Sequence, residues 1–429
     1  MMITKRLVIS NALFLAISLT HADDLTLKPL SDPELSQVQG QALMNLTYTD
    51  PSKANASMAS QNIGFYKLGM EADVELNANI NKLQLGCGGV NGAGGCDIDI
   101  DKLSLSGIAE TREGRVTSSA KMTNPFIEFA IKNPNSASTR EMMGFRLSAE
   151  KVLGMLTLGE ENTGSPDGIN SLSGALKIKP TTGSAVTAQR GMNYDDTNTA
   201  ITGRINLLQL WPLPALAPGF SSTTYDLTLR PTAANLTVNG TTLKGTRMTD
   251  AKLTGQANIA NLNFDGRITA NLSIPLVSLI PLGINANGYI SGLKANLDVT
   301  EDLGYIHKLP LNNPFSLSLQ KQAIHWSGAE YAANKGWWLA IEDEIDIGKI
   351  VPQNPIEISN DILKQVVPQI STFLNNNPPT CTLGACLAVG LDIGDINLSS
   401  ANPLYFPIKD LPLATQNFAP NCYGSLKFC

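Results

Sequence analysis

The chain has 429 residues, enough for two or three domains or for one extended β structure. Acidic residues outnumber basic ones by 37 to 31, which argues against a protein that binds nucleic acid. Charged residues make up only 16%, and Gly, Asn, Ser and Thr are abundant, as in β-rich exported proteins.

Residues 1–22 are predicted to be a secretory signal peptide. Lys5 and Arg6 precede an apolar run, Leu7 to Leu19, which is too short to span a membrane. Thr20-His21-Ala22 then offers a cleavage site with small residues. Without the two cations the mature chain has 29 basic against 37 acidic residues, a net charge of −8.

Residues 23–64 are predicted to hold a short helix and a linker. In the run from Leu30 to Leu43, Ser31 and Glu34 form a capping box, and Pro33 suits a first helical turn. We interpret this helix as one that docks on a sheet edge. The alternative interpretation is a sorting or assembly tag.

The β-rich body is predicted to cover residues 65–429, with a sub-boundary near the polar stretch 181–200. Its clearest element is a long β-hairpin over Met70–Gly107, closed at a glycine-rich tip by a disulfide between Cys87 and Cys96. In an antiparallel pair of strands, the residue numbers of two opposite residues always add to the same value, here called the index sum. The Cys87–Cys96 disulfide therefore fixes the register of the hairpin. In that register every apolar residue faces another: Leu85 faces Ile98, Leu83 faces Ile100, Ile80 faces Leu103 and Ala78 faces Leu105.

The alternation of this hairpin slips phase at Asn81-Lys82 and at Asp101-Lys102, which lie opposite each other. Matched slips predict that the ribbon turns its apolar face over, or bends from one sheet to another. We expect strands that flip faces at one level of a shared sheet, because the same spacing recurs at Ala257-Ile259-Leu262-Phe264 and at Leu391-Ile393-Ile396-Leu398, where Gly394 suits a bulge.

Other elements follow from local patterns. Residues 124–131 are apolar on nearly both faces and predict a buried strand. Asn-Pro-apolar starts recur at Asn124, Asn313 and Asn402. The stripe within Ser359–Leu374 predicts an amphipathic helix that Ser359 caps and Pro368 kinks.

The six cysteines form three close pairs, which predict local disulfides and an oxidising compartment. Six cysteines allow 15 connectivities, and a metal site is the weaker alternative because no pair has Cys-x-x-Cys spacing. The predicted pairs are Cys87 with Cys96, Cys381 with Cys386, and Cys422 with Cys429.

Few residues are candidates for chemistry. Asp97, Asp99 and Asp101 are expected to share one strand face, and calcium binds carboxylate oxygens, but without ligand-like loop spacing these residues favour a solvated polar face. His307 and His325 favour packing over catalysis, and no catalytic motif is present. We therefore expect no catalytic residues, no metal, no cofactor and no enzymatic activity.

Apolar surfaces are the remaining candidates. The proline-bounded runs 207–220 and 275–284 suggest either core strands or a lipid groove. Trp211, Trp337 and Trp338 are a candidate contact surface, although adjacent strand residues point to opposite faces, so one of the last two should be buried.

Three segments together resemble the FilA-type pilus assembly proteins, an exported gammaproteobacterial family. These segments are LSDPELSQVQGQAL at Leu30–Leu43, FYKLGME at Phe65–Glu71 and GCGGVNGAGGCDIDID at Gly86–Asp101. The resemblance is most specific over Leu30–Gly107. It implies a role in surface fimbriae and brings no catalytic residue with it. The chain is far longer than one pilin domain, so subunit, adhesin and accessory factor all remain open.

The resemblance and the residues together predict a non-enzymatic, exported structural protein that acts in pilus assembly or cell-surface adhesion. Its expected partners are other pilus or envelope proteins, and its expected location is the periplasm, the outer membrane surface or a fimbrium. The alternative is a periplasmic β-cradle that binds lipid or another amphiphile. A hydrolase of the envelope is a third hypothesis.

Overall fold

The computed structural model describes residues 43–160, 165–208, 216–274, 277–312, 315–382, 385–409 and 419–425. The predicted signal peptide and N-terminal helix lie outside these ranges. The described chain is mainly β with long antiparallel strands, which confirms the predicted fold class. Its helices are α2 (Ala56–Ala59), α3 (Arg112–Thr117), α4 (Tyr194–Thr197) and α5 (Asn360–Asn376), with short 3₁₀ turns η1 (Pro51–Lys53), η2 (Leu303–Tyr305), η3 (Ala385–Leu387) and η4 (Tyr423–Ser425).

A twelve-stranded sheet, here called the large sheet, has the order β1-β2-β6-β7-β22-β23-β8-β5-β4, with β3, β16 and β21 beside this path. A further pairing of β5 with β7 closes part of it into a ring of strands. Its strands are β1 (Met44–Thr49), β2 (Ile63–Met70), β3 (Asp73–Leu76), β4 (Ala78–Leu85), β5 (Ile98–Ser106), β6 (Ala120–Lys132), β7 (Glu141–Thr157), β8 (Ile169–Ile178), β16 (Thr241–Met248), β21 (Lys308–Leu311), β22 (Phe315–Gln320) and β23 (Gly336–Ile345). Residues 44–64, expected as linker, thus contribute β1, η1, α2 and the start of β2.

The predicted hairpin is β4 and β5, and its register is confirmed. The four apolar pairs lie opposite each other as the index sum requires. The Cys87–Cys96 disulfide closes the tip. Cys381 is bonded to Cys386, and Cys422 is disulfide-bonded too, although its predicted partner Cys429 lies outside the described residues.

The phase slip in this hairpin turns the apolar face over within one sheet. Before Lys102, whose φ is +46°, β5 pairs with β8; after it, β5 pairs with β7. Ile98 and Ile100 precede the slip and Leu105 follows it with the opposite parity, yet all three are buried in the same core. The slip therefore lets β5 change partner while its apolar side chains keep facing the core.

Two five-stranded sheets follow, and five segments of the chain run through both of them in the same order. The first sheet has the order β26-β20-β17-β15-β9, and the second has β25-β19-β18-β14-β10 in the same lateral positions. The strands of the first are β9 (Thr181–Val186), β15 (Ala233–Val238), β17 (Asp250–Ile259), β20 (Lys294–Asp302) and β26 (Leu404–Lys409). Those of the second are β10 (Arg190–Asn193), β14 (Thr224–Leu229), β18 (Leu262–Ile274), β19 (Val277–Ser291) and β25 (Val389–Asn397).

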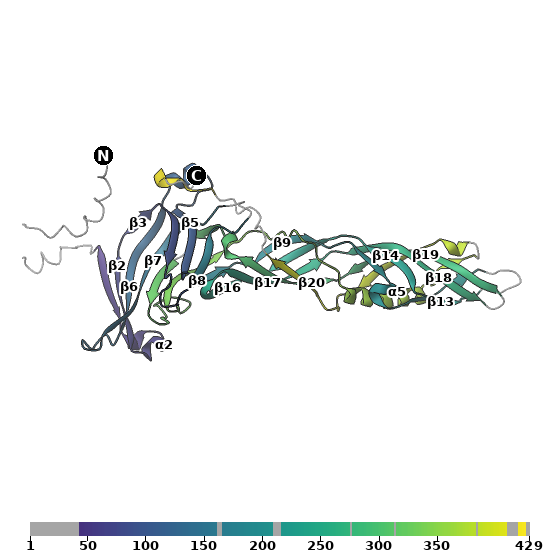
Figure 1. Ribbon diagram of the computed structural model, residues 1–429, viewed down its shortest axis with the longest axis horizontal. Helices are drawn as coiled ribbons and strands as arrows, with labels where there is room; N and C mark the ends of the chain where they lie inside the picture. Colours follow the sequence, from purple (N-terminus) through teal and green to yellow (C-terminus); the bar gives the residue numbers. More distant parts are fainter. Residues whose placement is uncertain are drawn as a thin grey trace, which may run out of the picture. The chain divides into compact units, whose positions relative to one another are not determined.

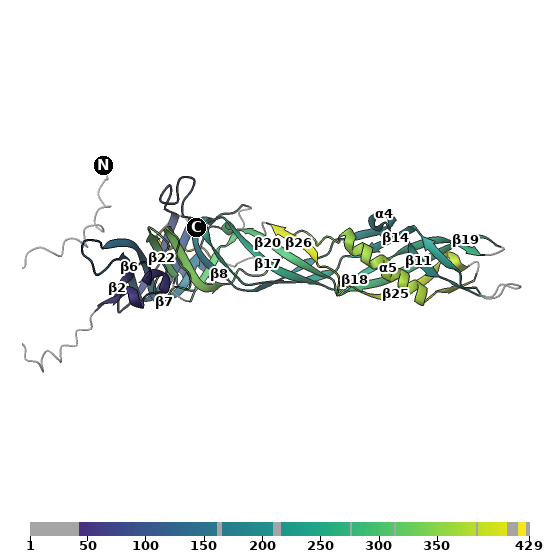
Figure 2. The same cartoon turned by 90° about the horizontal axis from the view of Figure 1, so that it is seen from below.

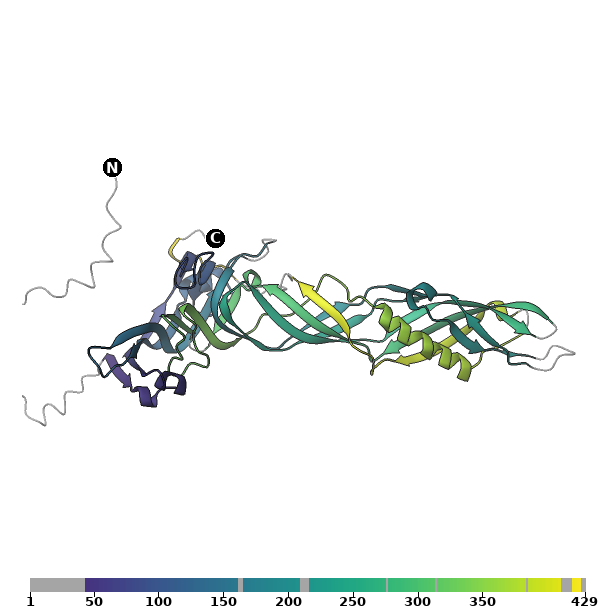
Figure 3. The ribbon, with the colours of Figure 1, turned by 60° about the horizontal axis from the view of Figure 1, so that its bottom comes forward.

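The central ribbon of these sheets is a single long hairpin, β17 and β18 against β19 and β20 (Figure 1). Asp250 faces Asp302 and Leu262 faces Ile290, and both pairs have the index sum 552 although they lie in different sheets. The slip after Ile259 marks the passage between sheets. The strands of this ribbon do flip faces at one level, as predicted, but they pass from one sheet to another there and do not stay in a shared sheet. Figure 3 shows β26, in yellow, beside β20, with which it pairs in parallel.

Local predictions met different outcomes. The bulge at Gly394 is present, with a φ of +70° and a register shift against β19. β22 and β26 begin directly after their Asn-Pro pairs. Asn124-Pro125 does not start a strand but lies within β6, where β6 changes partner from β3 to β2. The polar stretch 181–200, predicted as a sub-boundary, contains β9, β10 and α4, because pairing with β15 and β14 outweighs local composition.

Helix α5 lies along β11 (Ile201–Arg204) and β25 (Figure 2). Its predicted apolar stripe is buried, apart from the half-buried Phe373, and Ser359 is its N-cap residue without a side-chain cap bond. A Cβ at Gly203 would lie 2.8 Å from Leu374 Cβ, so a glycine there permits the close approach. The remaining short strands are β12 (Asn206–Leu207), β13 (Gly219–Ser222) and β24 (Thr380–Cys381).

A buried ion pair fixes the glycine-rich hairpin tip against the large sheet. Asp97 is fully buried, and its Oδ1 accepts hydrogen bonds of 3.0 Å from Arg247 Nε and from Asn91 Nδ2. Its Oδ2 accepts a 3.0 Å bond from the Trp337 amide, and Arg247 also donates to the Gly92 carbonyl. One carboxylate thus joins the tip to β16 and to β23.

Arg247→Met is expected to lower the free energy of unfolding by about 3 kcal/mol or more, because Asp97 would stay buried without a counter-charge. Urea denaturation followed by fluorescence measures this loss. The matched control is Arg230→Met, since Arg230 pairs with Asp265 at the surface and should cost about 1 kcal/mol or less. Equal losses in both variants would contradict the structural role given to Asp97.

Candidate functional site

One face of the large sheet carries an exposed apolar surface, here called the apolar face. It consists of two rows of side chains that cross β1, β2, β6, β7, β22 and β23, each row formed by residues directly opposite one another. The first row is Leu46, Leu68, Ile127, Leu147, Leu317 and Leu339. The second is Tyr48, Tyr66, Phe129, Phe145, Leu319 and Trp337. Strands lie about 4.8 Å apart, so each row is about 24 Å long.

The apolar face is continuous with the protein core at one end and open at the other. Leu317, Trp337 and Leu339 are half-buried and pack against the main core. Away from the core, the exposed fraction is 40% for Leu147, 38% for Ile127 and 67% for Leu46, and Leu68 is half-buried. Covering large apolar side chains of this exposure would contribute about 1 kcal/mol each. Exposed apolar surface on this scale is typical of interaction sites.

Aromatic contacts order the second row. The Tyr48 and Tyr66 rings have centroids 4.6 Å apart, and Phe145 meets Trp337 edge-on at 5.9 Å. Burial, and then the neighbouring carboxylate of Asp50, raise the pKa of Tyr48 above its ordinary value. The Tyr48 hydroxyl donates to Asp50 Oδ2 at 3.3 Å. The row therefore combines flat apolar rings with a few polar hydroxyls at its outer end.

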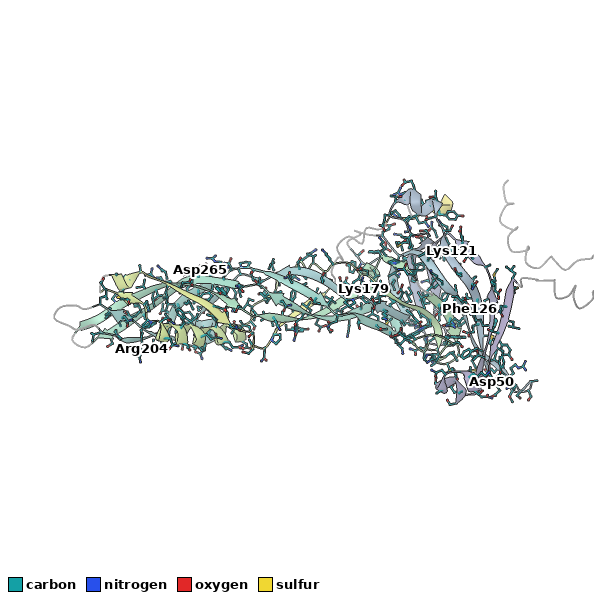
Figure 4. All side chains as sticks on the ribbon, turned by 180° about the vertical axis from the view of Figure 1, so that it is seen from behind. Asp50, Lys121, Phe126, Lys179, Arg204 and Asp265 are labelled. Carbon is teal, nitrogen blue, oxygen red and sulfur yellow. A yellow bond between two sulfur atoms is a disulfide. The ribbon has the colours of Figure 1, made fainter. Side chains whose placement is uncertain are left out.

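On β6 and β7 the opposite face is covered around Glu128 and Arg146, although these two residues are charged. Glu128 and Arg146 form a buried ion pair of 2.5 Å, and the Arg146 guanidinium also lies over Phe126 and Trp326. Arg146 donates to the Ser327 carbonyl, and Trp326 belongs to the core cluster that packs there. Figure 4 labels Phe126 on β6, on this covered side.

The prediction of a strand buried on both faces was therefore wrong for β6. The predicted alternation is present, but only the face with the charged residue is buried: Glu128 is 1% exposed and Ile127 is 38% exposed. The segment after β22, which carries Trp326, covers the side that holds the charge. Hydrophobicity alone does not reveal which face a distant segment covers.

The structure separates the three tryptophans that the sequence proposes as a contact surface. Trp337 lies in the apolar face, whereas Trp338 points the other way and is 1% exposed. Trp211 lies outside the described residues. Sequence analysis missed the outer part of the face, on β1 and β2, although Leu46-Thr47-Tyr48 and Tyr66-Lys67-Leu68 carry the alternation that marks a strand.

The candidate residues for chemistry have structural contacts. Asp99 and Asp101 form ion pairs with Lys82, at 2.5 and 2.8 Å, as a solvated polar face predicts. Asp97 departs from that prediction, because the hairpin tip folds back over it. His307 Nδ1 donates to the Leu158 carbonyl, and His325 Nε2 donates to the Ala329 carbonyl.

The structure describes most of one predicted proline-bounded apolar run, 275–284, and only the two ends of the other, 207–220. Residues 277–284 lie in β19, and Leu282 and Ile284 are buried in the core. The run 207–220 is described only at its two ends, in β12 and around β13. Among the described residues, no group of three or more acidic, histidine or cysteine side chains is placed to hold a metal, and no helix is long and apolar enough to cross a membrane.

The fold and this surface define the class of the protein: a disulfide-bonded, mainly β protein with an exposed apolar sheet face. No family model, curated protein or solved structure matches the chain.

Leu147→Lys is expected to reduce the fluorescence of a bound hydrophobic dye, because the lysine would place a charge at the centre of the apolar face. Dye titration at constant protein concentration measures the change. The control is Val186→Lys, since Val186 is 55% exposed on β9, away from this face. If both variants bind the dye like the parent chain, the apolar face is not the accessible surface.

Proposed function

We propose that the protein is a non-enzymatic, exported structural component of a pilus or another cell-surface assembly, and that it joins a partner protein through the apolar face. The observation that carries the proposal is the apolar face itself. A chain that kept four exposed and eight half-buried large apolar side chains on one open sheet face would risk aggregation unless a partner covered them.

The composition of the face supports protein contact. Tyr, Trp and Phe supply large contact area at low cost in side-chain entropy, and they are enriched in protein interfaces. Five of the twelve residues are aromatic, and they lie in one row. The local disulfides are compatible with export, and the resemblance of Leu30–Gly107 to FilA-type pilus assembly proteins favours a pilus as the assembly.

Deletion of the gene from the bacterium that encodes this chain is expected to reduce surface fimbriae or attachment. Electron microscopy and adhesion assays measure both. A copy carrying Leu147→Lys should fail to restore them, whereas a copy carrying Val186→Lys should succeed, provided that both accumulate at parental levels. Unchanged fimbriae and unchanged attachment after deletion would contradict the proposed function.

A second candidate function is the binding of a lipid or another amphiphile on the same face. The observation that favours it is the continuity of the face, whose rows of about 24 Å run from the open edge to the protein core without a charged residue. Such a surface would accept an extended acyl chain along a row.

Native mass spectrometry of the purified chain is expected, under this second function, to show a bound species that Leu147→Lys removes. Val186→Lys again serves as the control and should retain the species. A parent chain that carries no additional mass, and gains none after incubation with phospholipid vesicles, would count against amphiphile binding and leave the protein partner as the occupant.

A further inference from the structure

The outer edge of β1 differs from the other sheet ends. Among the described residues, six strands lie at the ends of the strand orders of the three larger sheets, and five of them carry features that discourage further pairing. The strands β3, β16 and β21 also pair with one strand each, and all three contain charged residues. Lys82 lies on β4, Pro407 and Lys409 lie on β26, and β25 has the Gly394 bulge. β10 has only four residues, and the backbone of Ile350 and Ile356 bonds to β9 or its end.

β1 has none of these features. Its six residues, Met44–Thr49, include no proline, lysine or other charged residue, and they pair with β2 in an unbroken register. Among the described residues β1 pairs with β2 alone. Five of its six residues are exposed, and they alternate apolar and polar. Such a regular, uncharged edge is the kind that accepts another strand.

The sequence of β1 is also suited to antiparallel pairing with a second copy of itself. A closed pair of identical copies requires a two-fold axis, which makes the two β1 strands antiparallel. The apolar residues of β1 have even numbers, so the apolar residues of the two copies lie on the same face of the joined sheet only if the index sum is even. With a sum of 92, Leu46 faces Leu46 of the second copy, Met44 faces Tyr48, and Asn45 faces Thr47.

The other central register is poorer. With a sum of 94, Thr47 would face itself and Met44 would face Asp50, which places a carboxylate against an apolar side chain. The first register instead forms three apolar cross-strand pairs and two polar ones. Each such pair contributes up to about 1 kcal/mol.

We propose that two copies of this chain join edge to edge through β1, antiparallel about a two-fold axis that passes beside Leu46. The large sheets then form one continuous sheet, and both rows of the apolar face run across the junction. The inference goes beyond the proposed function, because it concerns the edge of β1 and leaves the apolar face uncovered.

Cysteine cross-linking tests the junction and its register in the purified full chain. Leu46→Cys is expected to give a disulfide-linked dimer under mild oxidation, since directly opposite Cβ atoms lie about 4.5–5.5 Å apart. Tyr48→Cys should not, because the two copies of residue 48 would be four residues apart along the strands, about 13 Å. Val186→Cys, on another exposed strand, measures random collision.

A second pair of variants tests the association without cysteine. Asn45→Lys combined with Thr47→Lys places lysines opposite each other across the junction and should weaken dimerisation about tenfold or more in sedimentation experiments. Leu147→Lys should leave the dimer intact, so the experiments distinguish a failure of the β1 dimer from a failure of binding at the apolar face. A parent chain that stays monomeric at its highest soluble concentration, or cross-linking at Tyr48 rather than Leu46, would overturn the proposal.

Discussion

The structure depends on one constraint: a strand that changes its pairing partners along its length must keep its apolar side chains on the core side. Period-two alternation permits only one face, so each change of partner requires a phase slip. In β5 the slip lies at Lys102, where the partner changes from β8 to β7. In the ribbon β17–β20 the slips lie opposite each other, and the whole hairpin passes between sheets without losing register.

Matched slips explain how five segments cross from one five-stranded sheet to the other in the same order. If only one strand slipped, its hydrogen bonds to both neighbours would shift by a residue. Because the paired strands slip together, the index sum is unchanged, and the buried residues on either side of the passage belong to one core. This rule applies to the four antiparallel segments, which form eight strands, whereas β25 and β26 change their offset against β19 and β20.

The same alternation, applied to β6 and β7, produces the apolar face. The segment after β22 covers the side that holds Glu128 and Arg146, whose ion pair lies beside the ring of Trp326. The aliphatic and aromatic side is consequently left open. Among the described residues, this open face lies beside a β1 edge that pairs with β2 alone, and these are the surfaces proposed for a partner and for a second copy.

The mainly β class, the hairpin register, the two described local disulfides and the apolar stripe of α5 could be predicted from the amino-acid sequence, because each depends on residues close in the chain or on a constant sum of paired residue numbers. The phase slips were visible too. The tertiary structure alone decided which sheet each strand joins, that Asp97 is buried by Arg247, and which face of β6 is covered. These outcomes depend on contacts between segments more than 100 residues apart, and local periodicity is the same whichever face a distant segment covers.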